Sequence, residues 1–411
     1  MRNSMKKEII MCTLVYIFFV IFNFVYALPD FATVEANGKK YITAESSLKT
    51  NAPVFNFKSE AQVLMEANTG KIIYANNETN ELYPASVTKI MTMLLIMEKI
   101  DSGVLKYTDT VTCTKEASLM GGSQIWFKEG ETLTIEEALK CIAIVSANDV
   151  SYAMAELIGG SYENFISMMN NKAKELGMEN TNFMNAHGID EEGHYTCAKD
   201  IALMSRELIC KHPDILKYTS IWQDSIRNGT FTLSSTNKLL KIYNGLTGLK
   251  TGSTSNAMYN LSATATRDGL TLIAVVMKAP TGEIRNQEIT TLLNYGFSTY
   301  SVRQLCKKGE IVDKIKVNKN ISKEVNVVCK ESKSILTLKG DNQEYIKVVD
   351  INNKIFAPIT NNTSVGNIVW KNKDGEIIEK VDLVIEEKIE RSKLGEYISK
   401  MILNFTKFVE F

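Results

Sequence analysis

The feature that most constrains the fold is a pair of predicted β-hairpins that lie far apart in the chain. Residues 62–65 and 71–74 flank a turn in which Gly70 provides the positive φ that a tight turn needs. Residues 260–277 form a similar pattern, with an apolar run on each side of a turn at Gly269. Strands this far apart must be joined across the intervening chain, which predicts a single antiparallel sheet.

The chain between the two hairpins is predicted to form helices. Apolar residues recur at helical spacing in residues 90–97, 135–145 and 150–158, and a further helix is expected after the second hairpin, from about Glu283 to Tyr295. Hairpins that bracket a helical block predict an α+β fold, in which helices flank the antiparallel sheet.

The chain changes character after Tyr300. Short β-branched segments follow one another, separated by turn residues such as Asp374-Gly375, and this pattern predicts a smaller all-β second domain. The expected organisation has five parts: signal peptide 1–27, linker 28–55, catalytic domain 56–298, β-rich domain 299–389 and an amphipathic C-terminal helix 390–411.

The first part is typical of a secretory signal peptide. Basic residues precede an uncharged apolar run over residues 9–21, and the small residue Ala27 offers a cleavage site. The alternative is an uncleaved anchor helix, which Asn23 and Pro29 disfavour. The sequence therefore predicts a protein secreted across the cytoplasmic membrane.

The last part predicts an amphipathic helix. Its apolar residues fall at helical spacing with charged residues between them, and they are interrupted too often to span a bilayer. Such a helix either lies in a membrane interface or docks on the core of its own protein, and we favour the interface. The apolar residues are Leu394, Tyr397, Ile398, Met401, Ile402, Phe405, Phe408 and Val409.

Charge and cysteine content exclude some partners and leave others open. Lys and Arg together number 47, as do Asp and Glu, so no net field marks the chain for nucleic acid. The 7 cysteines show no C-x-x-C spacing, and a chain of 411 residues needs no disulfide framework to fold. Their redox state stays open.

Three short motifs occur in the order Ser86-Val87-Thr88-Lys89, Ser146-Ala147-Asn148 and Lys250-Thr251-Gly252. The first pattern also occurs elsewhere, for example at Ser46 and Ser235, so context must decide. Ser86 opens the most apolar helix, where backbone N–H groups favour developing negative charge, and Lys89 lies one turn further on the same face. This arrangement suits a serine nucleophile and a lysine base, although a helix cap and a solvated lysine are the simpler alternative.

The other two motifs have equally simple alternatives. Ser146 and Asn148 lie between two predicted helices, where they either reach a cleft or cap a helix. Lys250 and Thr251 lie just before the second strand pair, where they either bind a carboxylate or belong to a solvated turn, and Gly252 would let a substrate approach the backbone.

Taken together, the three motifs resemble those of penicillin-binding proteins and serine β-lactamases. The segments around them look most like the serine-type D-alanyl-D-alanine carboxypeptidases, the low-molecular-mass penicillin-binding proteins. The segments are Tyr83-Pro84-Ala85-Ser86-Val87-Thr88-Lys89, Asn185-Ala186-His187-Gly188-Ile189-Asp190, Gly193-His194-Tyr195-Thr196 and Gly248-Leu249-Lys250-Thr251-Gly252.

The resemblance implies the reaction and the roles of the first two motifs. The enzyme would remove the terminal D-alanine from peptidoglycan stem peptides through an acyl-enzyme, and penicillin would inhibit it. Ser86 would be the nucleophile and Lys89 its base. Ser146 would pass a proton to the leaving D-alanine, and Asn148 would hold the substrate backbone. No cofactor is implied.

The third motif would recognise the end of the substrate. The resemblance implies that Lys250 and Thr251 bind the terminal carboxylate, with support from Arg285. The backbone N–H groups of Ser86 and Ser253 would form the oxyanion hole.

Two other functions compete with this prediction. A serine β-lactamase would share the acylation machinery, but no E-x-x-L-N segment lies between Asn148 and Lys250. A catalytically silent scaffold that binds peptidoglycan would be favoured by a broken motif, and all three are intact. A zinc site at His187, Asp190 and His194 is disfavoured because their spacing is not that of a helical metal site.

Overall fold

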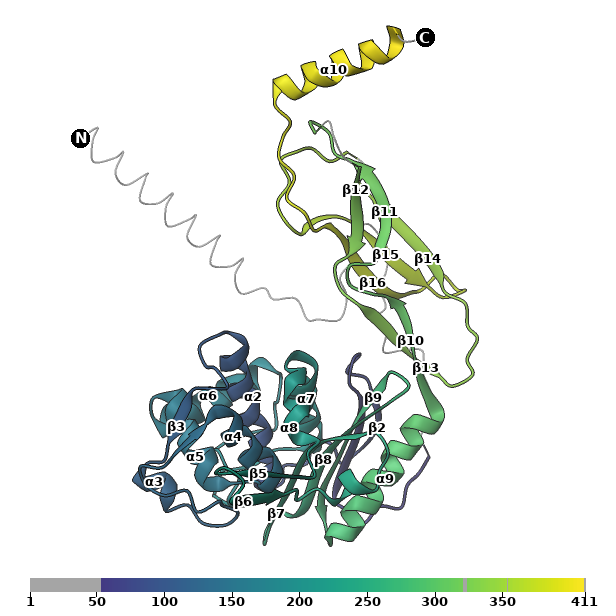
Figure 1. The fold of residues 1–411 in the computed structure, drawn as a ribbon. Helices are drawn as coiled ribbons and strands as arrows, with labels where there is room; N and C mark the ends of the chain where they lie inside the picture. Colours follow the sequence, from purple (N-terminus) through teal and green to yellow (C-terminus); the bar gives the residue numbers. More distant parts are fainter. Residues whose placement is uncertain (1–52, 321–323, 353, 410–411) are drawn as a thin grey trace, which may run out of the picture. The chain divides into compact units, whose positions relative to one another are not determined.

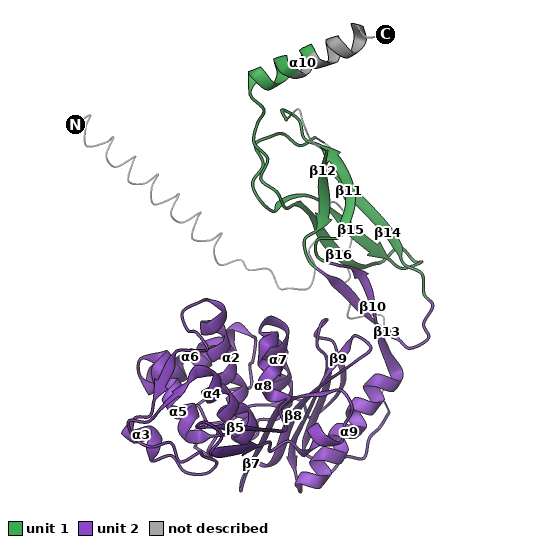
Figure 2. Ribbon diagram, in the orientation of Figure 1, with its two compact units in different colours: residues 1–50, 308–331, 343–411 green, residues 51–307, 332–342 purple. Residues whose placement is uncertain are grey.

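The structure is a computed structural model that describes residues 53–320, 324–352 and 354–409. The predicted signal peptide, and the linker up to residue 52, lie outside the described residues. The chain forms two compact units (Figure 2). Within the described residues, the first unit in the chain comprises residues 53–307 and 332–342, and the second comprises residues 308–331 and 343–409.

The first unit is built on a five-stranded antiparallel sheet with the strand order β2-β1-β9-β8-β7 (Figure 1). Gly70 adopts φ 73° between β1 and β2, and Asp268 and Gly269 adopt φ 50° and 79° between β8 and β9, so both predicted hairpins form where turn residues permit positive φ. The strands are β1 (Ala61–Glu66), β2 (Ile72–Asn76), β7 (Leu246–Thr254), β8 (Met258–Arg267) and β9 (Leu270–Ala279).

The sheet separates two apolar cores. Along β9, Ile273 and Val275 face a core shared with helices α2 and α7, whereas Leu272 and Ala274 face a core that α9 covers. This alternation follows from the period of a strand, in which successive side chains point to opposite faces. The predicted α+β fold is therefore confirmed. The long helices are α2 (Lys89–Asp101), α5 (Asn148–Gly159), α6 (Tyr162–Glu175), α7 (Ala198–Lys211) and α9 (Gly282–Thr299).

Shorter elements complete the helical side and carry the loops that approach the sheet edge. They are η2 (Ala85–Thr88), β3 (Thr110–Thr112), α3 (Lys115–Ser118), β4 (Thr132–Thr134), α4 (Ile135–Lys140), η3 (Cys141–Val145), η4 (Pro213–Ile215), α8 (Leu216–Thr219), β5 (Gln223–Ile226), β6 (Phe231–Ser234) and η5 (Lys238–Lys241).

The third motif lies within a strand that the sequence pattern does not predict. Lys250, Thr251 and Gly252 belong to β7, which pairs only with β8 among the described strands and so forms the edge of the sheet. Glycines and polar residues interrupt the apolar pattern of β7, which is why its period was not visible. The motif is thus held by a strand and not by a turn before the strand pair.

The described residues between 300 and 393 form strands and no helix, as predicted. Its main sheet has the order β11-β12-β16-β15-β14, and β13 pairs instead with β10, so this two-stranded ribbon groups with the first unit. The strands are β10 (Tyr300–Cys306), β11 (Ile311–Lys316), β12 (Glu324–Cys329), β13 (Lys333–Leu338), β14 (Ile346–Ile351), β15 (Thr363–Lys371) and β16 (Ile377–Ile385). The domain boundary at residue 298 stays a prediction.

The predicted terminal helix is present as α10 (Leu394–Val409). Leu394, Ile398 and Met401 are each at least 48% exposed, so these apolar side chains have little cover from the other residues that the structure describes. Within the described ranges, no helix is long and apolar enough to cross a membrane.

Candidate active site

Ser86 lies on the short turn η2, directly before α2, and two glycines let other backbone segments pack against this turn. A Cβ on Gly188 would lie 1.9 Å from the carbonyl oxygen of Ala85, and one on Gly252 would lie 2.8 Å from that of Pro84. Neither position can accept a side chain without moving backbone. At Gly252 the close neighbour is the chain's own turn, and Gly252 also lines the cleft, so approach of a substrate to its backbone stays a prediction.

The Lys89 side chain is fully buried beside Ser86. Its Nζ atom lies 3.0 Å from Ser86 Oγ, 2.6 Å from Asn148 Oδ1 and 2.6 Å from the carbonyl oxygen of His187. The sequence placed Lys89 one turn from Ser86 on the same helical face, and the structure brings the two side chains into contact.

Burial controls the charge of both site lysines. Desolvation, and then the charge of Lys250, hold the pKa of Lys89 well below its usual value, while Asp149 opposes the shift. Desolvation and then Arg285 lower the pKa of Lys250 to about 7. Because both groups release protons more readily than a free lysine, one of them can act as a base near neutral pH.

Ser146 and Asn148 approach the same spot from the helical side. Helix α4 begins with a capping box of Thr134 and Glu137 and continues into the wide turn η3, which ends at Ser146 with φ 66°. Ser146 Oγ is buried and has no hydrogen-bond partner among the described residues, although hydroxyl groups this buried are normally paired. Asn148 is anchored through Nδ2 to the carbonyl oxygen of Gly121, at 2.7 Å.

The edge strand β7 forms the opposite side of the site. Thr251 faces the cleft, where its Oγ1 lies 2.6 Å from Thr236 Oγ1. Lys250 is only 1% exposed and is not among the residues that line the cleft, and its ammonium donates to the carbonyl oxygen of Thr251 at 3.0 Å and lies near enough to Lys89 to lower the pKa of that lysine. Arg285 of α9 lines the cleft beside Asn286, which accepts from its guanidinium.

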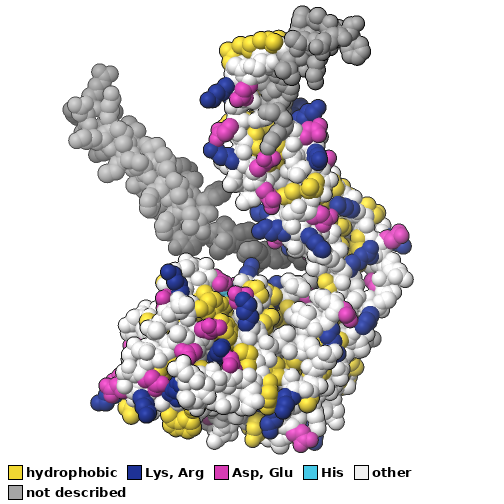
Figure 3. Space-filling model, in the orientation of Figure 1, with side chains coloured by type: hydrophobic (Ala, Val, Ile, Leu, Met, Phe, Trp, Pro, Cys, Tyr) yellow, Lys and Arg dark blue, Asp and Glu magenta, His cyan; other side chains and the backbone are white. Residues whose placement is uncertain are grey.

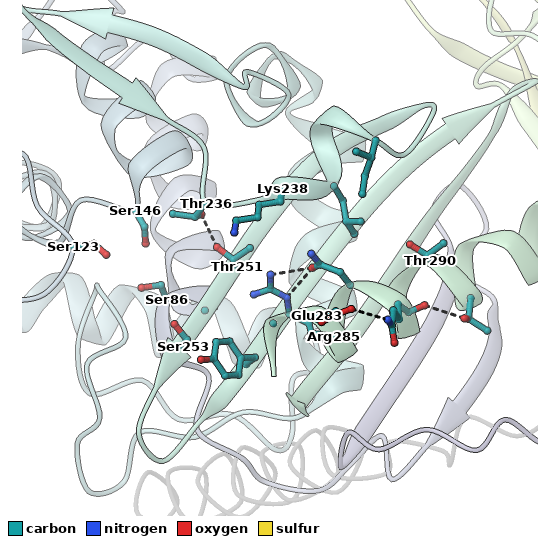
Figure 4. Close-up of a pocket in the computed structure, with 18 residues that line it drawn as sticks. Ser86, Ser123, Ser146, Thr236, Lys238, Thr251, Ser253, Glu283, Arg285 and Thr290 are labelled. Carbon is teal, nitrogen blue, oxygen red and sulfur yellow. Dashed lines mark hydrogen bonds between the residues drawn. The ribbon is translucent and has the colours of Figure 1, made fainter. Parts of the chain in front are cut away.

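Residues of all three motifs, Ser86, Ser146 and Thr251, line one cleft of about 890 Å³ (Figure 4). In Figure 4, Ser86, Ser146 and Ser253 lie at one side, Thr251 and Arg285 lie in the middle, and Thr290 lies at the other side. The three motifs, which are far apart in sequence, therefore meet in a single open site.

The two site histidines have protein partners. His187 Nδ1 accepts from the N–H of Ile189, and His194 Nδ1 accepts from the N–H of Met184 while its Nε2 pairs with Thr88. Burial lowers the pKa of His187 to about 3 and that of His194 to about 4. Neither imidazole is charged at neutral pH.

Asp190 also has a structural partner. Its carboxylate accepts from Thr254 Oγ1 at 2.7 Å, which ties this loop to the end of β7. The segment from His187 to His194 thus packs between α2 and the sheet edge.

Sequence reasoning missed several residues of the site. Thr236 belongs to none of the three motifs, yet it contacts Thr251, and Ser123 and Lys238 also line the cleft. Asp149 holds the loop beside the second motif by accepting from the N–H groups of Ile125 and Phe127, both at 3.0 Å. No local spacing indicates these contacts, because each depends on how distant segments pack.

A serine on a helix-opening turn, contacted by a buried lysine and facing the edge strand of an antiparallel sheet, defines a class of protein. It is that of the serine acyl-transfer enzymes, which includes penicillin-binding proteins and serine β-lactamases.

Comparison with known proteins narrows this class. Residues 47–281 match the family model described as D-alanyl-D-alanine carboxypeptidase, and residues 300–391 match that of the penicillin-binding protein 5 C-terminal domain. The chain belongs to the D-alanyl-D-alanine carboxypeptidase family and is a serine-type hydrolase of the penicillin-binding protein type.

Individual relatives cover most of the chain. D-alanyl-D-alanine carboxypeptidase DacF of Bacillus subtilis is 42% identical over 85% of this chain and 91% of its own. DacC of Escherichia coli is 32% identical over 81% and 84%. A crystal structure of penicillin binding protein 5 from Haemophilus influenzae is 28% identical, with a TM-score of 0.67, and the match covers 83% of this chain and all of that one.

Proposed function

We propose that Ser86 is the nucleophile of this carboxypeptidase and that Lys89, in its neutral form, is the base. A neutral amine has two N–H groups and one lone pair. Two of the three partners of Lys89, the oxygens of Asn148 and His187, can only accept hydrogen bonds. The two N–H groups are therefore used by these oxygens, and the lone pair faces the Ser86 hydroxyl at 3.0 Å. This contact is the observation that carries the proposal.

Acylation follows from this arrangement. Ser86 Oγ attacks the carbonyl of the penultimate D-alanine while Lys89 takes its proton. The backbone N–H groups of Ser86 and Ser253 would stabilise the oxyanion, and Ser146, with its unpaired hydroxyl, would pass a proton to the leaving amine. Asn148, which already holds Lys89, would also hold the substrate backbone. Water then hydrolyses the ester.

The terminal carboxylate would bind at the middle of the cleft. The Thr251 hydroxyl and the Arg285 guanidinium both line the cleft there, so they can contact the carboxylate directly. Lys250 is buried and would act through its charge. In this proposal Lys250 does not contact the carboxylate directly, in contrast to the role that the family resemblance implies.

Release of D-alanine from a pentapeptide tests the base. Lys89→Met keeps the length of the side chain and removes the amine, so kcat should fall by about 10²–10⁴. Lys99→Met, on the same helix but outside the site, is the matched control and should keep full activity. A Lys89→Met enzyme as fast as wild type would contradict the assignment.

The acyl-enzyme formed with penicillin should be long-lived. Fast deacylation in β-lactamases needs a carboxylate that activates water. The carboxylate among the residues that line the cleft is Glu283, which lies on the α9 side, and Glu191 is engaged by Asn185. The β-lactamase alternative predicts rapid turnover of penicillin, which a spectrophotometric hydrolysis assay would detect.

The same proposal includes export and attachment to the outer face of the cytoplasmic membrane. Residues 1–27 would direct export, and α10 would lie in the membrane interface. Apolar side chains follow one another along the coloured part of α10 in Figure 3, and Leu394 and Met401 are 76% and 68% exposed. Burying each such side chain contributes roughly 1.5–3 kcal/mol before ordering costs.

Flotation with anionic liposomes tests the attachment. The full chain should float, whereas a chain truncated after Ile389 should stay in solution and still release D-alanine. The variant Met401→Asp should float less than the full chain, and Ser399→Asp, which should float as the full chain does, is the charge-matched control. Equal recovery of full-length and truncated protein with the liposomes would contradict the proposal.

A further inference from the structure

An exposed indole lies on the loop of residues 119–131, which joins α3 to β4. Trp126 is 64% exposed, although tryptophan side chains are buried for the most part, and its backbone φ is 55°. A positive φ is rare for a residue with a bulky side chain, so the surrounding structure must hold it there. Ser123, three residues earlier on the same loop, lines the catalytic cleft (Figure 4).

Two side chains hold the backbone on both sides of Trp126. The N–H groups of Ile125 and Phe127 donate to Oδ2 of the buried Asp149, at 3.0 Å each. The guanidinium of Arg227 donates to the carbonyl oxygens of Ile125, at 3.1 Å, and of Trp126, at 3.4 Å. These four hydrogen bonds fix the strained conformation that leaves the indole in solvent.

An aromatic ring also contacts the indole. Phe231 of β6 packs against it in a T-shaped arrangement, with ring centroids 6.1 Å apart. The guanidinium of Arg227 covers the Phe231 ring, at 5.1 Å from its centroid. Because the backbone and one neighbouring ring already restrain the indole, a ligand that stacks on it pays little additional ordering cost. Asn228, on the turn of the same hairpin, adds an exposed amide.

The loop lies on the acyl side of the proposed nucleophile. Figure 4 shows Ser123 on the far side of Ser86 from Arg285, where the terminal carboxylate would bind. The leaving D-alanine would therefore lie towards Arg285, and the rest of the stem peptide towards Ser123.

The length of the stem peptide brings a sugar to this loop. The first residue of the stem peptide is attached to the glycan strand, and an extended chain places it about 14 Å from the scissile carbonyl of the fourth residue. Trp126 is at most about 11 Å from Ser123, because three residues separate them. The indole is therefore within reach of the sugar that carries the bound peptide.

We propose that Trp126 is a stacking platform for a sugar ring of the glycan strand, and that it makes the enzyme prefer stem peptides that are still attached to glycan. The inference rests on the catalytic roles proposed above. A pyranose ring has C–H groups on its faces and hydroxyl or acetamido groups at its edges. One face can cover the apolar, electron-rich face of the indole while the edges stay in water.

Two substrates with the same peptide sequence test the inference. The full-length enzyme is given a disaccharide pentapeptide and the free pentapeptide, and release of D-alanine is measured over a range of concentrations. Wild type should have the lower KM for the disaccharide pentapeptide. Trp126→Ala should raise that KM about fivefold and leave kcat unchanged, because stacking is equal in the ground state and the transition state. Its KM for the free pentapeptide should change less than about twofold.

Two further variants separate stacking from general effects. Trp126→Tyr keeps an aromatic ring and should retain most of the preference. Val104→Ala is the matched control, because Val104 is 72% exposed and lies beyond the end of α2, a helix of 13 residues that begins beside Ser86 and is about 20 Å long. This control should leave both KM values unchanged. Labelling with fluorescent penicillin, which carries no sugar, verifies that each variant is folded.

Tryptophan fluorescence gives a measurement that does not depend on turnover. A Ser86→Ala protein cannot form the acyl-enzyme, so it can be titrated with the disaccharide pentapeptide. Stacking on the indole should change the emission. The double variant Ser86→Ala/Trp126→Phe should lose most of this change, although the other two of the 3 tryptophans remain.

The outcomes distinguish this inference from the proposed function. If wild type has equal KM values for the two substrates, or if Trp126→Ala leaves both KM values unchanged or raises both equally, the platform is wrong and the carboxypeptidase roles stand. If wild type releases D-alanine from neither substrate, the catalytic roles are wrong and this inference falls with them.

Discussion

Replacing Lys250 with methionine should weaken recognition of the substrate carboxylate and make the protein more stable. Lys250 is 1% exposed, and burial followed by the charge of Arg285 lowers its pKa from 10.5 to about 7. The protonated form is therefore disfavoured in the folded state. Methionine has a similar length and carries no charge, so it removes this cost.

The magnitude follows from proton linkage. The unfolded chain holds the proton up to about pH 10.5 and the folded chain releases it near pH 7, so the lysine lowers stability progressively as pH falls from 10.5 to about 7. At pH 7 the cost is roughly 4 kcal/mol, since each pKa unit corresponds to about 1.4 kcal/mol. Losing the hydrogen bond to the Thr251 carbonyl oxygen returns about 1 kcal/mol. The net gain is roughly 3 kcal/mol.

Thermal unfolding of the full-length protein, followed by intrinsic fluorescence, measures this gain in stability through the transition of the first unit. A stabilisation of that size raises Tm by roughly 6–12 °C in a domain of this length. The difference from wild type should shrink as pH rises and vanish near pH 10.5. Lys115→Met, at an exposed position, should leave Tm unchanged. A Lys250→Met protein that melts at or below the wild-type temperature at pH 7, or whose advantage does not change with pH, would refute the reasoning.

Two further predictions concern the geometry and charge of the site. Gly252→Ala should slow acylation by penicillin about a hundredfold, because its Cβ would lie 2.8 Å from the carbonyl oxygen of Pro84 and displace the turn that carries Ser86. Stopped-flow kinetics measure the acylation rate, and a rate equal to that of wild type would contradict this close packing. For a D-alanyl-D-alanine peptide, kcat/KM should fall as pH rises above about 7, because Lys250 loses its proton there. For a substrate without the terminal carboxylate, kcat/KM should show no such fall.

Most of the fold could be predicted because helices, hairpins and turns depend on residues that are close together in the sequence. The hairpins at Gly70 and Gly269 depend on turn residues that tolerate positive φ, and the helices depend on apolar spacing, so neither needs knowledge of distant contacts. Strand β7 was not predicted, because its glycines and polar residues belong to the site and interrupt the alternation of apolar and polar residues. The pairing of β13 with β10 could not be predicted either, because the residues of a strand do not specify which other strand it pairs with.

The site was predictable only in part, for the same reason. Ser86 and Lys89 are one turn apart, so their contact follows from helix geometry. The contact of Lys89 with Asn148, and that of Thr236 with Thr251, join segments that only the tertiary fold brings together. The packing of Gly252 against the turn that carries Ser86 could not be predicted either, because the sequence does not show which segment of the chain passes close to a glycine.

The identity of the acylated residue tests the central claim most directly. The protein is incubated with penicillin, its intact mass is recorded, and the modified peptide is sequenced by tandem mass spectrometry. We predict one adduct for each chain, located on Ser86, and none on a Ser86→Ala variant, because a β-lactam amide reaches the same nucleophile as the substrate. An adduct on the Ser86→Ala variant, or on Ser46 or Ser235 of the wild type, would contradict the account.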